Sequence, residues 1–333
     1  MPGKLIVDEI EDSGGSSVIG RKNFIINGNF DLWQRGTSVT GQTSDQYLAD
    51  RWIFQADGST YSYQQASFTA GQTDVPNNPK YYANLTVTGA NADARIQQPI
   101  EDVNTLSGQK ATISFWAKHT TNAPTDLRVR IRQTFGSGGS TAVNTALTPD
   151  FTTTTSWQKF TYTTTIPSVS GKTIGAGSAV AVQIMNPNNE VWDLQIAQVQ
   201  VEKGGVATDF EVRPIGEELA LCERYFQIFI EGTQEIMTGG YYTGSVILGA
   251  IHFPTMRDEP SISVTSGTNY YRFWRNNAGD DFDDFDNISS IGKKTARLQN
   301  NTGMSGTAGH AGTVVGYNAN SKITLDAELW YKK

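Results

Sequence analysis

Apolar and polar residues alternate over short segments along most of this chain. The alternation is clear in Ile113–Ala117 and in Leu194–Val201, and a period of two residues places the apolar side chains on one face of a β-strand. In the second segment the phase changes at Ala197, where a β-bulge would restore one apolar face and one glutamine face. Turns rich in Gly, Pro and Asn separate such segments. The pattern therefore predicts an all-β protein built from short strands.

One long segment, Pro214–Phe229, has a helical period instead. Its apolar residues recur at steps of four and three, which is the a and d spacing of a heptad repeat; they are Ile215, Leu219, Cys222, Phe226 and Phe229. Glu217 and Glu218 follow the start, where the helix dipole favours negative charge. The spacing predicts a helix over 214–230 that stops before Gly232.

Two hypotheses are open for the apolar stripe of this helix. In the first it lines the axis of a homo-oligomer whose β-domains supply most of the interface. In the second the helix is a connector packed on its own domain, and a second apolar face would serve that packing, formed by Leu221, Tyr225 and Ile228. Two heptads are too short to hold helices together alone, so the sequence does not decide between them.

We predict four parts along the 333 residues. Residues 1–20 form an arm that docks on another protein, and Leu5–Val7 could add as a strand to a neighbour. Residues 21–213 hold many short strands separated by turns, which predicts a two-sheet jelly-roll sandwich. The helical segment with its stop, 214–232, connects this domain to a smaller C-terminal β-sandwich at 233–333.

Charge and composition disfavour several classes of function. The net charge is −7 and no basic stripe is predicted, which argues against a nucleic-acid partner. The single cysteine, Cys222, excludes an intramolecular disulfide, and the three histidines lie in separate segments without the spacing of a zinc site. No apolar run is long enough for membrane insertion. Residues 1–20 lack the apolar core of a signal peptide, so we expect synthesis in the cytoplasm without export.

Aromatic residues lie on both faces of the predicted strand Tyr270–Arg275. Exposed aromatic planes stack on the C–H faces of sugars while nearby carboxylates bond hydroxyl groups, although burial between subunits explains the same pattern. With the acidic loop that follows, the candidate ligand-binding residues are Tyr270, Tyr271, Trp274, Asp280, Asp281, Asp283 and Asp284. In the first domain we expect Trp33 and Trp52 to fill the core instead.

The acidic loop holds five aspartates within the seven positions Asp280–Asp286. Such a density of charge repels itself unless a cation, an arginine or water screens it. The spacing is not that of an EF-hand loop, so a solvated acidic loop and a calcium site are both open. No other metal or cofactor is predicted. No Ser-His-Asp or Cys-His pattern identifies catalytic residues, which favours a protein that is not an enzyme.

Several blocks in the first two thirds of the chain resemble a domain common in bacteriophage tail-fibre proteins. The block F-I-I-N-G-N-F-D-L-W-Q-R-G-T-S opens it at Phe24–Ser38, and E-E-L-A-L-C-E-R-Y-F-Q at Glu217–Gln227 resembles the helix that follows it. Between them, in the same order, are Tyr47–Trp52, Gln97–Lys118, Ser156–Pro167 and Val199–Pro214. The resemblance implies a jelly roll similar to carbohydrate-binding modules, followed by a small β-domain, in trimeric fibres.

From this resemblance we expect a structural protein of the phage virion. The first hypothesis is a homotrimeric tail fibre that attaches to host cell-surface polysaccharide through residues 233–333 and is held by residues 1–20 to another virion protein. The alternatives are a capsid-decorating head fibre and a glycan-degrading tailspike enzyme. A virion protein released by lysis would also explain an extracellular type of composition without an export signal.

Overall fold

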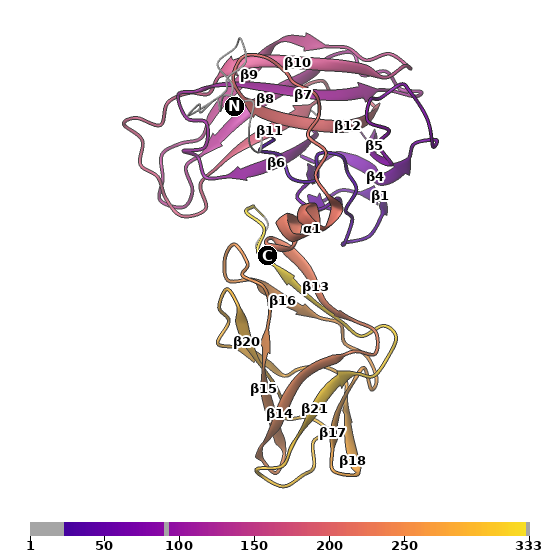
Figure 1. The fold of residues 1–333 in the computed structure, drawn as a ribbon, viewed down its shortest axis with the longest axis vertical. Coiled ribbons are helices and arrows are strands. Elements are labelled where there is room, and N and C mark those ends of the chain that lie inside the picture. The colour runs from indigo at the N-terminus through magenta and orange to yellow at the C-terminus, as the bar shows by residue number, and fades with distance from the viewer. Residues whose placement is uncertain (1–22, 90–92, 331–333) are drawn as a thin grey trace, which may run out of the picture. The chain divides into compact units, whose positions relative to one another are not determined.

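The computed structural model describes residues 23–89 and 93–330, so the predicted docking arm lies outside the described residues. Apart from one short helix, the regular elements of this part are β-strands, which confirms the predicted all-β class. The chain divides into two compact units between Glu218 and Leu219, and Figure 1 shows the strands of each. Within the described ranges, no helix is both long and apolar enough to cross a membrane.

The first unit is a sandwich of two antiparallel six-stranded sheets (Figure 1). In hydrogen-bonding order, one sheet consists of β1 (Ser38–Gln42), β4 (Thr60–Ser67), β5 (Tyr81–Gly89), β12 (Trp192–Lys203), β7 (Lys110–Lys118) and β10 (Gln158–Thr165). The other consists of β2 (Gln46–Tyr47), β3 (Ile53–Gln55), β6 (Arg95–Glu101), β11 (Ala179–Met185), β8 (Leu127–Thr134) and β9 (Val143–Phe151). Two sheets over one core are the architecture of the predicted jelly roll.

Aromatic side chains fill the core between these sheets. Trp52 is fully buried, its ring stacks on Phe30 with centroids 5.0 Å apart, and its indole N–H donates to the carbonyl oxygen of Asn27 at 3.0 Å. Trp33 is also buried and donates its indole N–H to the carbonyl of Phe30. A buried indole needs such a partner, because an unpaired N–H away from water costs free energy. The predicted core role of both tryptophans is confirmed.

The predicted β-bulge is present in β12. The register against β7 shifts between Ala197 and Gln200, and Gln198 has a φ of 50°. The extra residue restores the phase, because the apolar residues on both sides of it lie in the core: Leu194, Ile196, Val199 and Val201. The bulge also turns the Gln198 side chain toward the loop before β5, where its amide donates to the carbonyl of Pro76 at 2.7 Å.

The helix is shorter than predicted. It spans α1 (Ile215–Glu223), and the chain then enters strand β13 (Phe226–Glu231), so the prediction of a helix over 214–230 is wrong in its second half. Strand β13 pairs with β22 (Lys322–Asp326) near the other end of the unit. Aromatic and β-branched residues favour strands. The F-Q-I-F-I sequence therefore forms a strand that pairs with the distant β22, although its local period also fits a helix.

This change separates the residues of the predicted axial stripe. Phe226 and Phe229 belong to β13, while Ile215 on α1 is 59% exposed and Cys222 is buried. Leu219 is half-buried on the same helix. The five residues therefore do not form one apolar stripe on one helix. The homotrimer itself stays a prediction.

The second unit has a three-stranded and a seven-stranded antiparallel sheet. The first consists of β13, β22 and β16 (Ser261–Val264). The second consists, in hydrogen-bonding order, of β18 (Ala278–Phe282), β17 (Tyr271–Arg275), β21 (Ala311–Gly316), β14 (Glu235–Thr243), β15 (Val246–His252), β20 (Thr295–Asn300) and β19 (Asn287–Ser289). Their apolar residues form one buried core, as expected for the predicted C-terminal β-sandwich.

A buried carboxylate fastens the loop after β7 to strand β12 in the first unit. Asp193 is 2% exposed, and it accepts hydrogen bonds from the backbone N–H groups of Thr120 at 2.5 Å, Thr121 at 2.9 Å and Asn122 at 2.7 Å. Burial acts to raise the pKa of Asp193, but these bonds together outweigh it and hold the pKa below its usual value near 3.8.

We expect Asp193→Asn to lower the free energy of unfolding by about 2–4 kcal/mol, since charge-assisted bonds to a buried carboxylate are lost. A carboxyl group with a lower pKa in the folded state stabilises the fold above its unfolded pKa. That stability is lost as the pH falls from about 4 through the folded value. Urea unfolding at neutral and acid pH tests this: the variant should lose less stability on acidification than the wild type. An equal acid loss in both proteins would contradict it.

Candidate functional site

The predicted ligand-binding strand β17 has one buried and one outward face. Tyr271 and Phe273 are fully buried in the core of the second unit, so the ring of Tyr271 is not available to a ligand. Tyr270 is half-buried and packs against the same core. Trp274 is 45% exposed on the outward face. Of the three predicted aromatic residues, Trp274 therefore offers the ring that solvent reaches most.

Two neighbours shape the surface around Trp274. Gly279 on β18 pairs with Trp274 in the sheet, and a Cβ atom at Gly279 would lie 3.2 Å from a carbon of the indole. The glycine therefore lets the indole lie close against β18. Tyr317, which follows β21 and is 42% exposed, meets the indole edge-on with ring centroids 6.4 Å apart.

A cation lies beside both rings. The Arg272 guanidinium carbon is 3.6 Å from the ring centroid of Tyr317 and 4.6 Å from that of Trp274. Asp281 on β18 fixes this guanidinium with a two-point ion pair, in which Nη2 donates to Oδ2 at 2.7 Å. We call Arg272, Trp274, Asp281 and Tyr317 the aromatic platform. It joins partly exposed ring surface to a charged donor and a carboxylate acceptor, the combination that sugar recognition uses.

The other predicted aspartates point away from a common centre. The side chain of Asp280 lies on the opposite face of β18 from that of Asp281. There it pairs with Arg275 at 3.0 Å and accepts a hydrogen bond from the Tyr241 hydroxyl. Asp283 accepts from the backbone N–H of Asn269 at 2.8 Å. Asp284 accepts from the next backbone N–H in the chain, and burial raises its pKa.

These partners screen part of the charge of the loop. Asp286, the last of the five, accepts from the backbone N–H groups of Asn301 at 2.5 Å and Thr302 at 3.1 Å. In the described part of the chain, no group of three or more His, Cys, Asp or Glu residues is placed to hold a metal ion. Calcium at Asp280–Asp286 stays a prediction that a binding measurement would have to test.

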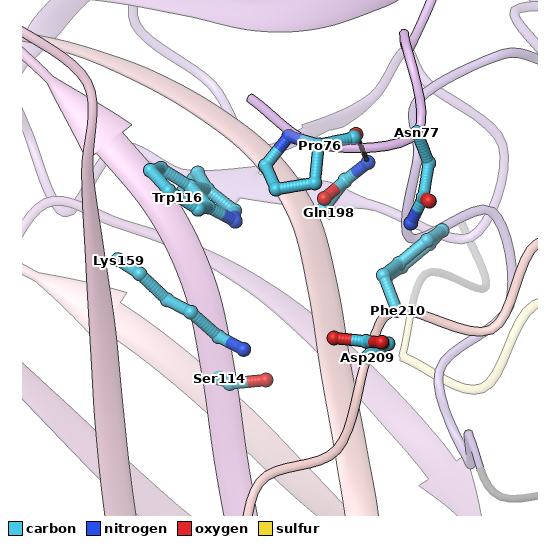
Figure 2. Close-up of a pocket in the computed structure, with 8 residues that line it drawn as sticks. All are labelled: Pro76, Asn77, Ser114, Trp116, Lys159, Gln198, Asp209 and Phe210. Atoms are coloured by element: carbon cyan, nitrogen blue, oxygen red, sulfur yellow. Dashed lines mark hydrogen bonds between the residues drawn. The ribbon is translucent and has the colours of Figure 1, made fainter. Parts of the chain in front are cut away.

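A second surface lies on the first unit, and Figure 2 shows its pocket. Trp116 faces Pro76, and the side chain of Lys159 extends toward Ser114. The pocket volume is about 30 Å³, which is the share of one water molecule in the liquid. It can accept a single small polar group but cannot enclose a sugar ring. The remaining lining residues are Asn77, Gln198, Asp209 and Phe210.

A larger hollow of about 200 Å³ on the same unit is lined in part by Trp157, Lys118 and Asp74. The Trp157 ring is half-buried and already in contact with other side chains. Its centroid lies 5.1 Å from that of Phe68 and 5.3 Å from the Lys118 ammonium nitrogen. Because less of this indole is open to solvent than of Trp274, the aromatic platform of the second unit is the stronger candidate for a ligand.

Sequence reasoning missed two platform residues, Arg272 and Tyr317. Arg272 lies between Tyr271 and Phe273 in the predicted strand. The period of two was visible in the sequence and places Arg272 on the same face as Trp274. Tyr317 lies about 40 residues away, and it reaches the site because β21 pairs with β17, with Arg272 opposite Val315. That pairing depends on the fold of the whole unit and leaves no local signal.

No family model matches this sequence, and no curated protein matches it. The chain is similar to several solved structures. A CBM4 structure is 22% identical, covering 53% of this chain and 97% of that chain with a TM-score of 0.34. The CBM22-1–CBM22-2 tandem domain of Paenibacillus barcinonensis Xyn10C is 10% identical, covering 86% of this chain and 96% of that chain with a TM-score of 0.35.

A phage protein is also among the similar structures. The enzymatically active domain of bacteriophage CBA120 tailspike protein 4 is 18% identical, with a TM-score of 0.34. The match covers 54% of this chain but only 21% of that chain. At these identities and TM-scores the similarities carry no argument about function, which has to be built from the residues of this chain.

Proposed function

We propose that this protein is a structural protein of a phage virion, a tail fibre that attaches to host cell-surface glycans through the aromatic platform. The observation that carries the glycan part is the 45% exposed Trp274, held between Arg272, Tyr317 and Gly279. The resemblance of the blocks from Phe24 to Gln227 to phage fibre proteins supports the virion part.

The platform suits a weak, repeated contact. A single ring with a few polar groups at its edge buries little area, so one site alone would bind weakly. A homotrimer would present three copies, and linked sites gain apparent affinity through effective concentration without any new contact. The trimer, and attachment of residues 1–20 to another virion protein, therefore belong to this proposal. Sedimentation of the purified chain tests the trimer. A monomeric mass would mean that no linked sites are present to provide avidity.

Trp274→Ala should weaken binding of the full chain to its glycan by at least about tenfold, because aromatic anchors contribute most of the affinity in small sites. A glycan array identifies the sugar, and titration calorimetry measures the dissociation constant. Tyr242→Ala is the matched control, since Tyr242 is 73% exposed on β14 of the same unit but outside the platform. If both variants bind like the wild type, the platform is not the contact.

Two other outcomes separate the alternatives. Labelled antibody on intact virions should mark the tail, and a signal on the capsid would make the protein a head fibre. Incubation with host polysaccharide should release no oligosaccharides. Their release would identify a glycan-degrading enzyme, for which two carboxyl groups would have to face one bond.

A further inference from the structure

Strand β8 of the first unit places three arginines on one face. Its sequence L-R-V-R-I-R-Q alternates so that Leu127, Val129 and Ile131 are buried in the core. Arg128, Arg130 and Arg132 point the other way and are half-buried. Neighbours on one face of a strand are roughly 7 Å apart along it. This places a row of positive charge on a chain whose net charge is −7.

A chain of glutamines crosses the sheet and holds two guanidinium groups in place. Arg130 Nε donates to Oε1 of Gln183 at 2.6 Å. The Gln183 amide then donates to Gln97, and the Gln97 amide donates to Gln55. Arg95 closes the chain by donating from Nε to Gln55 Oε1 at 3.1 Å. Gln97 and Gln183 are almost completely buried, so this network has little freedom to move.

The charges in this row are only partly neutralised. Arg128 pairs with Asp150 at 2.7 Å and Arg95 pairs with Asp57. Among the described residues, no carboxylate lies within ion-pair distance of Arg130 or Arg132. Burial lowers the pKa of Arg130, and Arg95 and Arg132 lower it further, while Asp93 and Asp57 act in the opposite direction. Arginine nevertheless stays charged in proteins, so these two cations have no ion-pair partner among the described residues.

We propose that Arg130 and Arg132 form a binding site for an anionic group carried by a polysaccharide, either a carboxylate or a phosphate ester. The guanidinium fork matches both groups, because each offers two oxygens to two parallel N–H donors. The Arg130 Nε is engaged by Gln183, which leaves its two Nη atoms for the ligand, and the glutamine chain fixes their direction. Arg132, without a side-chain partner in the described structure, can turn to meet the second oxygen.

This site differs from the aromatic platform in place and in chemistry. It lies on the first unit and selects charge, whereas the platform lies on the second unit and offers ring surface. The choice of a polysaccharide as carrier rests on the proposed function, but the anion site itself does not depend on the platform. Trp274→Ala should leave anion binding unchanged, and loss of the arginines should leave binding of an uncharged glycan unchanged.

Binding of the full chain to polygalacturonate, dextran phosphate and unmodified dextran tests the proposal. The wild type should bind at least one charged polymer, and whichever binds identifies the group. The double variant Arg130→Gln/Arg132→Gln should bind it at least about tenfold more weakly, since two charge-assisted contacts are lost. Arg297→Gln is the matched control, because it removes one exposed positive charge from the second unit.

The single variant Arg132→Gln separates loss of binding from loss of folding, because no side-chain bond to other described residues holds this arginine. It should weaken binding about threefold and leave the melting temperature unchanged. Three results would overturn the proposal. They are the absence of binding to both charged polymers, an equal loss in Arg297→Gln, and equally tight binding of a short DNA duplex, which would make the attraction one of charge alone.

Discussion

Replacing Trp52 with alanine should lower the free energy of unfolding of the first unit by about 4 kcal/mol, which is the usual cost of truncating a large buried aromatic side chain. The ring has no solvent exposure, and it stacks on Phe30. Its removal would leave a cavity and would also deprive the Asn27 carbonyl of the indole N–H that it accepts at 3.0 Å. Packed neighbours relax only partly into such a space.

Urea unfolding followed by circular dichroism measures this loss. Trp274→Ala is the matched control, because it makes the same change at a half-exposed position and should shift stability by less than about 1 kcal/mol. Equal midpoints for Trp52→Ala and the wild type would mean that Trp52 does not support the core of this sandwich.

Gly312→Ala should destabilise the second unit by about 3 kcal/mol, toward the upper end for overpacking, because backbone atoms have to move. A Cβ atom on Gly312 would lie 2.0 Å from the carbonyl oxygen of Trp274 and 2.7 Å from a ring carbon of Phe273. The glycine allows β21 to approach β17 at the point where Trp274 sits. The variant should therefore weaken glycan binding as well as stability.

Gly216→Ala provides the control for this change. Among the described residues, no atom outside its own helix lies within 4 Å of a Cβ built at Gly216 in α1, and alanine favours a helix over glycine. Thermal unfolding should show Gly216→Ala as stable as the wild type or slightly more so. A Gly312→Ala protein that melts with the wild type would show that β21 can move away from β17 without cost.

The sequence predicts best where the information is local. The phase change at Ala197 identified the bulge in β12, because a period of two leaves no other way to keep one face apolar. Trp33 and Trp52 were placed in the core for a similarly local reason, their size and apolar surface. Alternation also located two long strands, because Ile113–Ala117 lies within β7 and Leu194–Val201 lies within β12.

Elements that depend on distant partners were not predictable in this way. The segment beginning at Phe226 fits a helical period and a strand equally well, and pairing with β22, about 100 residues later, decides for the strand. The aspartate-rich loop shows a similar limit. Its composition left a cation, an arginine or water open as the source of screening, and only the hairpin of β17 and β18 shows that Asp280 and Asp281 pair with different arginines.

The candidate site was predicted in part for the same reason. Trp274 was identified from its own strand, and the partners that shape its surface come from β18 and from the end of β21. Tyr271 was included because aromatic residues on both faces of a strand do not reveal which face is buried. Arg130 and Arg132 were missed because the sequence shows the alternation of β8 but not the absence of neighbouring carboxylates.

Adhesion of the labelled full chain to host cells tests the central claim most directly, with Trp274→Ala and Trp157→Ala compared at equal concentration and after each is shown to be folded. The two changes are chemically identical, but one lies on the platform of the second unit and the other beside the hollow of the first. We predict that Trp274→Ala loses most of the bound signal and that Trp157→Ala keeps it. Full adhesion by Trp274→Ala together with its loss in Trp157→Ala would contradict this account and place the glycan contact on the jelly roll.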